Sequence, residues 1–88
     1  MKFKLNKQVE KDLRKIGDKS VLMGFKEFLE EIKKASKVYD LNQVKKIKGG
    51  KNYYRYKYGD YRVGFKLEDN EIIILKLAHR REIYRYFP

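Results

Sequence analysis

The chain has 88 residues, 42% hydrophobic and 15% aromatic, which excludes a disordered segment and predicts one small domain over residues 1–88. It contains no cysteine and one histidine, which excludes disulfides, thiolate chemistry and multi-histidine metal sites. Its 23 Lys and Arg residues outnumber 12 Asp and Glu residues, and the resulting charge of +11 favours nucleic acid or an acidic protein as a partner.

The positive charge is uneven along the chain. There are 11 basic and seven acidic residues before Lys45, but 12 basic and five acidic residues from Lys45 onward. Most of these cations lie in strand-like segments rather than on an amphipathic helix, which argues against a membrane partner. No stretch is apolar enough for a secretory signal or a transmembrane helix, so we expect a cytoplasmic protein.

The first half predicts a strand followed by a helical hairpin. Residues 2–6 alternate between polar and apolar side chains, as a short strand does. Asn6 can cap a helix that Gly17 ends, and Asp18 or Ser20 can begin a second helix that ends near Lys37. The apolar stripes are Val9, Leu13 and Ile16 on the first helix and Val21, Leu22, Phe25, Phe28, Leu29 and Ile32 on the second.

The second half predicts four strands, at residues 44–48, 52–58, 61–68 and 71–78. Turn residues separate them at Gly49-Gly50, Gly59-Asp60 and Asp69-Asn70. The last strand is apolar on both faces, which is typical of a central covered strand, but its turn can hold two or three residues and leaves its register open. The tail, 79–88, can form a short helix or an extended flap. The predicted fold class is α+β, with the N-terminal strand and helical hairpin packed on one face of an antiparallel β-meander.

The hairpin around Gly59-Asp60 carries the strongest signal. A two-residue turn pairs Tyr58 with Tyr61, Lys57 with Arg62 and Arg55 with Gly64. One face then holds Tyr54, Tyr56, Tyr61, Val63 and Phe65 and belongs under the helices, while the cations point away and Gly64 leaves open space opposite Arg55. Like charges placed opposite each other destabilise a sheet by about a few tenths of a kcal/mol, so this arrangement favours an anionic ligand such as phosphate.

Most catalytic chemistries are excluded by the residues present. The carboxylates near the hairpin fall at turns, the two serines lie in the helical half, and no glycine-rich phosphate loop occurs. Metal-free cleavage of RNA remains, because RNA supplies its own 2′-hydroxyl nucleophile and needs no cofactor. His79, Tyr84 and Lys57 are the candidates for proton transfer, and the residues alone do not choose between them.

The segment Tyr54–Val63 followed by Ala78–Tyr84 resembles the RelE/ParE toxin superfamily of type II toxin–antitoxin systems. The resemblance covers nearly the whole chain. It implies an mRNA interferase that cleaves mRNA in the ribosomal A site by 2′-hydroxyl attack and that a cognate antitoxin holds inactive. By motif it implies a catalytic set of Arg55, Lys57, Arg62, Arg80 and Tyr84, with His79 where some ribosome-dependent relatives have a catalytic histidine.

The chain departs from the family pattern at two places. Arg55 stands where relatives have lysine, and Lys45, Lys46 and Lys48 stand near the position of a catalytic glutamate in some relatives. Two alternatives stay open: a ParE-type toxin that inhibits DNA gyrase, or an inactive basic RNA-binding homologue. General RNA contacts are expected from Lys45, Lys46, Lys48, Lys51, Lys66 and Arg81, and Tyr86 and Phe87 are expected to pack the tail.

Overall fold

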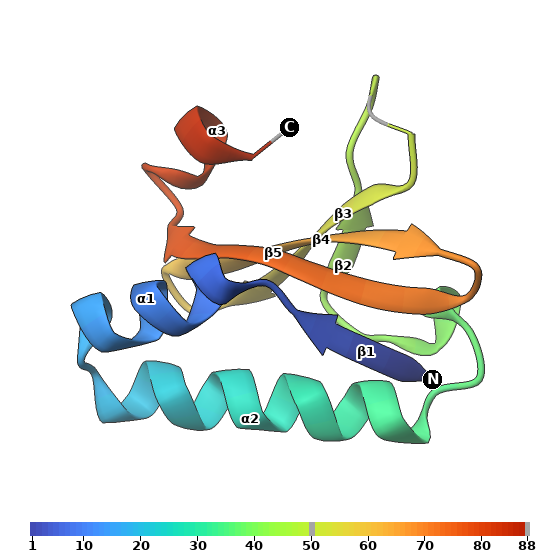
Figure 1. The fold of residues 1–88 in the computed structure, drawn as a ribbon, viewed down its shortest axis with the longest axis horizontal. Helices are drawn as coiled ribbons and strands as arrows, with labels where there is room; N and C mark the ends of the chain where they lie inside the picture. The colour runs from blue at the N-terminus through green and yellow to red at the C-terminus, as the bar shows by residue number, and fades with distance from the viewer. Residues whose placement is uncertain (50, 88) are drawn as a thin grey trace.

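The computed structural model describes residues 1–49 and 51–87, and it shows one five-stranded sheet with helices on both of its faces (Figure 1). Gly50 of the predicted Gly49-Gly50 turn and Pro88 of the predicted tail lie outside the described residues. The elements in chain order are β1 (Lys2–Leu5), α1 (Lys7–Ile16), α2 (Lys19–Lys34), a 3-10 turn (Val38–Asp40), β2 (Val44–Lys46), β3 (Tyr53–Tyr58), β4 (Tyr61–Glu68), β5 (Glu71–His79) and α3 (Ile83–Tyr86).

The strand order is β1-β5-β4-β3-β2, so the predicted meander is confirmed, but the N-terminal strand β1 joins the sheet at its far edge instead of packing with the helices on one face. β1 runs parallel to β5, whereas every other neighbouring pair is antiparallel. This places β5 between β1 and β4, as predicted from the apolar residues on both of its faces. The predicted α+β class is confirmed, although β2 is shorter than expected and α2 ends at Lys34 rather than near Lys37.

The helix boundaries follow from local capping. The Asn6 side chain accepts a hydrogen bond from the Gln8 N–H at 2.9 Å, and Gly17 ends α1 in the left-handed region at φ 61°. Asp18 caps α2 by accepting from the N–H groups of Ser20 and Val21. The Ser20 hydroxyl also donates to this carboxylate at 2.8 Å, and this hydrogen bond, followed by the two from the backbone, lowers the pKa of the Asp18 carboxyl. Within the described residues, no helix combines the length and apolarity needed to cross a membrane.

The main core lies between the sheet and the α1–α2 pair. Phe28 of α2 stacks on Tyr56 with ring centroids 4.0 Å apart, and Tyr54 stacks on Phe65 at 5.3 Å. Burial, helped by the nearby carboxylates of Glu31 and Glu27, raises the pKa of Tyr56 to about 12. The predicted helix-facing side of the hairpin is therefore confirmed as core, with Tyr61 at its half-buried margin.

A second, smaller core lies on the opposite face of the sheet. Ile83 of α3 and Phe87 of the tail are buried there against Ala78 of β5. Of the two residues expected to pack the tail, Phe87 does so, whereas Tyr86 is 61% exposed and its ring lies over the Lys76 ammonium. In Figure 1, α3 lies over the end of β5 from which the tail leaves the sheet.

Candidate active site

The β3–β4 hairpin places three cations on the face of the sheet opposite α1 and α2, which we call the open face because α3 and the tail cover only part of it. Its register is the predicted one, with Lys57 directly opposite Arg62 and Arg55 opposite Gly64. Lys57 is exposed, and Arg55 and Arg62 are half-buried. Because strand residues alternate between faces, the apolar partners that bury the other side fix these cations in position.

The Arg62 side chain is held by the turn that precedes it. Its Nη1 donates to the carbonyl oxygens of Gly59 at 2.9 Å and Tyr61 at 2.8 Å. Gly59 takes φ 55°, a left-handed conformation that glycine adopts readily, so the turn brings its carbonyl to the guanidinium. Arg62 is therefore oriented before any ligand binds.

The tail brings Tyr84 to the same place from a distant part of the sequence. The Arg55 guanidinium lies over the Tyr84 ring, 4.7 Å from its centroid, which is within the range of a cation–π contact. Most of the tyrosine side chain remains open to solvent, because the residue is 71% exposed. One face of this ring is thus backed by a cation, and the side chain is accessible to a ligand.

These side chains surround one groove with a volume of about 470 Å³. We call it the basic groove, and it is lined by Gln43, Val44, Lys45, Arg55, Lys57, Arg62 and Tyr84. Four of the seven lining residues are cationic and none is a carboxylate. An anion that enters the groove therefore meets positive charge on several sides without an acidic group to repel it.

Arg80 lies beside the hairpin turn and is not among the residues that line the basic groove. Its backbone N–H donates to the Asp60 carbonyl at 2.7 Å, and its Nε lies 3.8 Å from the Asp60 carboxylate. Both side chains are more than half exposed, so the ion pair is weak and the guanidinium stays free to turn toward a ligand.

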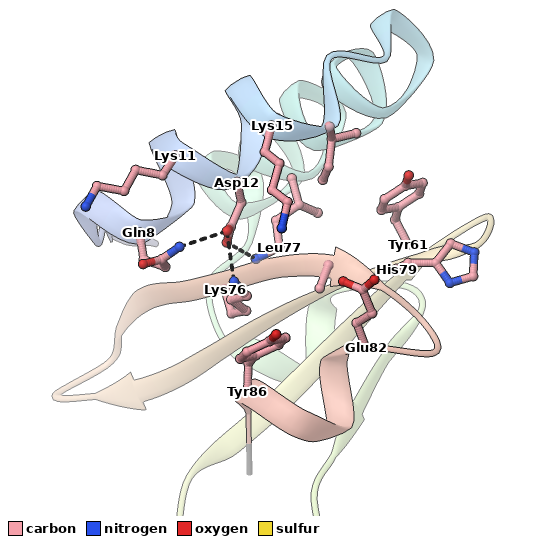
Figure 2. Close-up of a pocket in the computed structure, with 12 residues that line it drawn as sticks. Gln8, Lys11, Asp12, Lys15, Tyr61, Lys76, Leu77, His79, Glu82 and Tyr86 are labelled. Carbon is pink, nitrogen blue, oxygen red and sulfur yellow. Dashed lines mark hydrogen bonds and ion pairs between the residues drawn. The ribbon is translucent and has the colours of Figure 1, made fainter.

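His79 lies on the other face of the sheet. It pairs across the strands with Tyr61, and the two rings meet edge to face at 5.5 Å. Its Nδ1 accepts from the Arg81 N–H at 3.2 Å. His79 lines a separate pocket of about 510 Å³ between α1, β5 and α3 (Figure 2). The structure therefore does not bring His79 together with Arg55, Lys57, Arg62 and Tyr84.

The remaining predicted RNA contacts fall in four places. Lys45 lines the basic groove, and Lys46, Lys48 and Lys51 gather around the β2–β3 connection. Lys66 lies 3.1 Å from the Glu68 carboxylate in a partly exposed ion pair. Arg81 is exposed in the turn after β5. Within residues 1–49 and 51–87, no group of three or more His, Asp or Glu side chains is arranged to hold a metal ion.

The space predicted beside Gly64 is filled. A Cβ atom at Gly64 would lie 2.6 Å from Cγ of Phe87, so the glycine accommodates the tail ring instead of leaving an open groove opposite Arg55. The expectation was wrong because the contact joins residues far apart in the sequence. A glycine within a strand often marks the close approach of another group, which is the signal that this position offered.

Sequence reasoning also missed Asp12, which is buried at 5% exposure. Its carboxylate accepts from the Leu77 N–H at 3.0 Å, the Lys76 ammonium at 2.9 Å and the Gln8 amide at 3.0 Å (Figure 2). Asp12 falls on the same helix face as Val9, Leu13 and Ile16, and a carboxylate on an apolar face indicates a buried polar contact. Its role is structural, because it ties α1 to β5 away from the basic groove.

Comparison with known proteins identifies the family. A family model described as the ParE toxin of a type II toxin–antitoxin system, parDE, matches residues 3–84. The chain is 37% identical to the toxin RelE3 of Methanocaldococcus jannaschii, and the match covers 100% of both sequences. A chain of the RelB–RelE antitoxin–toxin complex from Methanococcus jannaschii has a TM-score of 0.80 at 35% identity, over 96% of this chain and 98% of that one. A chain of the toxin–antitoxin complex RelBE2 from Mycobacterium tuberculosis shares the fold, with a TM-score of 0.70 at 19% identity over 90% and 96% of the two chains. The chain therefore belongs to the RelE/ParE family of toxins of type II toxin–antitoxin systems.

Proposed function

We propose that this toxin is a metal-independent endoribonuclease that cleaves mRNA in the A site of the translating ribosome. The observation that carries the proposal is the convergence of Arg55, Lys57, Arg62 and Tyr84 on one groove without a carboxylate in its lining. Such a groove suits a phosphodiester whose negative charge grows during the reaction. It repels metal cations, so charge stabilisation falls to the side chains themselves.

The reaction uses a nucleophile that belongs to the substrate. The 2′-oxygen of the ribose attacks the adjacent phosphorus, and its proton passes to a base. The bond from phosphorus to the 5′-oxygen then breaks, and that oxygen takes a proton from an acid. The products are a 2′,3′-cyclic phosphate and a 5′-hydroxyl end. DNA lacks the 2′-hydroxyl and cannot react in this way.

The side chains of the basic groove divide this work. Arg62, oriented by two backbone carbonyls, stabilises charge on the phosphoryl oxygens, and Arg55 adds a second guanidinium. Tyr84 offers an aromatic surface on which a nucleobase of the mRNA can stack. Proton transfer falls to Lys57 or Tyr84 rather than to His79, because His79 lies on the opposite face of the sheet. Arg80 supplies positive charge at the margin of the site.

Binding to the ribosome draws on cations outside the reaction centre. Lys45, Lys46, Lys48 and Lys51 extend from the basic groove along the β2–β3 connection, and Lys66 and Arg81 add charge elsewhere. These residues contact RNA phosphates, so binding weakens steeply with salt. The proposal places the protein in the cytoplasm, where translation occurs.

The proposed protein partner is a cognate antitoxin. The structural relative from Methanococcus jannaschii is part of a RelB–RelE antitoxin–toxin complex, which supports this assignment. The net charge of +11 predicts that the antitoxin uses an acidic or amphipathic segment to cover the basic groove, displace the tail, or both.

The test maps mRNA 5′ ends on programmed ribosomes after addition of the purified toxin. We expect cleavage within the A-site codon, 5′-hydroxyl ends, and no cleavage when the attacking ribose is 2′-deoxy. Arg62→Ala should lower the cleavage rate by about a hundredfold to a thousandfold. The matched control is Lys19→Ala, which removes an exposed cation on α2 and should leave the rate unchanged.

Other outcomes separate the alternatives. The matched family model is that of a ParE toxin, so a gyrase-directed toxin is the second candidate. Growth arrest on expression without mRNA cleavage would rule out the ribonuclease and favour the gyrase-directed toxin. If the protein causes neither arrest nor cleavage, it is an inactive basic RNA-binding homologue.

A further inference from the structure

Tyr84 is delivered to the basic groove by an element that cannot hold it there alone. The α3 helix spans only Ile83–Tyr86 and has no side-chain cap at its N-terminus. One turn of helix is unstable in isolation, because nucleation costs more than its few hydrogen bonds return. The contact with the Arg55 guanidinium is weak, because the Tyr84 side chain is largely exposed to solvent. The position of Tyr84 must therefore be set by its neighbours in the chain.

Those neighbours are anchored on both sides of Tyr84. Ile83 is fully buried, and Phe87 is 6% exposed. They are four residues apart, so they lie on one side of the turn, and the Phe87 N–H donates to the Ile83 carbonyl at 2.9 Å. The turn is thus pinned to the sheet by its two ends.

Phe87 is held in a defined seat on β4. Its ring contacts the backbone of Gly64 and meets the Tyr53 ring edge to face, with centroids 5.5 Å apart. Gly64 is the cross-strand partner of Arg55. The tail ring is therefore fixed next to the residue whose guanidinium lies over Tyr84.

We infer that Phe87, seated on Gly64, is a positioning residue that sets the Tyr84 ring over Arg55 in the basic groove. The missing side chain at Gly64 is what lets the ring reach the sheet. The effect on catalysis rests on the proposed ribonuclease function, whereas the effect on the Tyr84–Arg55 contact does not.

The first experiment measures the Tyr84–Arg55 contact directly and needs no activity assay. The nuclear magnetic resonance of the Arg55 Nε–H group in the isotope-labelled toxin is shifted by the ring current of Tyr84. Tyr84→Ala removes the shift, and we expect Phe87→Ala and Gly64→Ala to move the resonance most of the way to the Tyr84→Ala position. The control is Tyr86→Ala on the same tail, which should leave it in place.

The second experiment measures single-turnover cleavage at saturating programmed ribosomes. We expect Phe87→Ala and Gly64→Ala to lower the rate by about tenfold to a hundredfold, because small misplacements cost that much. In a Tyr84→Ala background, Phe87→Ala should cause no further loss. Phe87→Leu, which keeps an apolar anchor, should recover part of the rate and serves if the alanine variant fails to fold.

Two results would overturn the inference. One is a folded Phe87→Ala protein whose Arg55 resonance is unchanged. The other is an equal loss of cleavage with and without Tyr84, which would mean that Phe87 acts by another route. If the wild-type toxin cleaves no mRNA, the proposed function fails, but the resonance experiment still decides whether Phe87 positions Tyr84.

Discussion

The two faces of the sheet are built by alternate residues of the same strands, yet different requirements determine them. On the helix-covered face, Tyr54, Tyr56, Val63 and Phe65 are buried and close-packed against α2. On the other face, Lys57 and Arg62 are neighbours of like charge with no carboxylate lining the groove they share. The first face stabilises the fold, whereas like charges on the second face destabilise it, and under the proposed function the second face is the one that binds RNA. Substitutions on the two faces should therefore affect different measurements.

The largest effect on stability is expected from the covered face. Phe65 is fully buried and contacts Tyr54 and Phe28. Phe65→Ala should lower the free energy of unfolding by about 3–5 kcal/mol, because it removes a buried ring and leaves a cavity. Urea unfolding measures this. The control from the open face is Tyr84→Ala, which should change stability by less than about 0.5 kcal/mol, and an equal loss there would break the comparison.

The open face should dominate activity. Replacing Arg55, Lys57 and Arg62 together by alanine should lower mRNA cleavage by at least about a hundredfold to a thousandfold and abolish growth arrest on expression. The free energy of unfolding should stay the same or rise slightly, since repulsion between cations is relieved. Growth arrest that survives in a folded triple variant would rule out the ribonuclease and favour a gyrase target.

A pH dependence should separate the faces next. The pKa of Tyr56 is raised from its usual 10 to about 12, chiefly by burial. Between these values the unfolded chain loses the Tyr56 proton while the folded chain keeps it, so the free energy of unfolding falls as pH rises. Tyr56→Phe, which keeps the ring stacked on Phe28, should flatten this decline in urea unfolding measured from pH 9 to pH 12. An identical decline in both proteins would contradict the assignment.

The smallest effect comes from the like-charge pair itself. Lys57→Gln should raise the free energy of unfolding by about 0.3 kcal/mol at low salt, because it removes the cation opposite Arg62. The gain should vanish at about 1 M salt, where screening acts within about 3 Å. Lys46→Gln is the control, since Lys46 faces Tyr54 across the strands and no cation. A gain that does not depend on salt would show that repulsion is not its cause.

Local patterns predicted the parts of the site that local chemistry determines. The Gly59-Asp60 turn set the register of the hairpin, and strand alternation then placed Arg55, Lys57 and Arg62 on one face. The last strand was harder. Its turn holds two residues, Asp69 and Asn70, both at positive φ. Farther from the turn, the pairing register of β4 with β5 shifts between Gly64 and Phe65. Because this register shift decides which face of the sheet His79 lies on, counting residues along β5 from the turn could not predict that face.

Contacts between distant segments account for the rest. The parallel pairing of β1 with β5, the seat of Phe87 on Gly64 and the bonds of Asp12 each join residues far apart in the sequence. Nothing in a local pattern names the partner in such a contact. Gly64 within a strand and Asp12 on an apolar face nevertheless indicated that some partner was required, and each position could have been read that way.

The carboxylate of Asp12 has one more consequence, for how copies of this chain meet one another. β1 pairs with only the first half of β5, so the second half has no strand beside it on that side among the described residues. An open strand edge is a template on which another chain can add a strand, and such pairing leads to aggregation. The Leu77 N–H donates to the Asp12 carboxylate, so it is not free to pair with another strand, and α1 lies beside this edge (Figure 2). Another copy of the toxin is therefore hindered from adding a strand at this edge, even where the toxin accumulates in a cell.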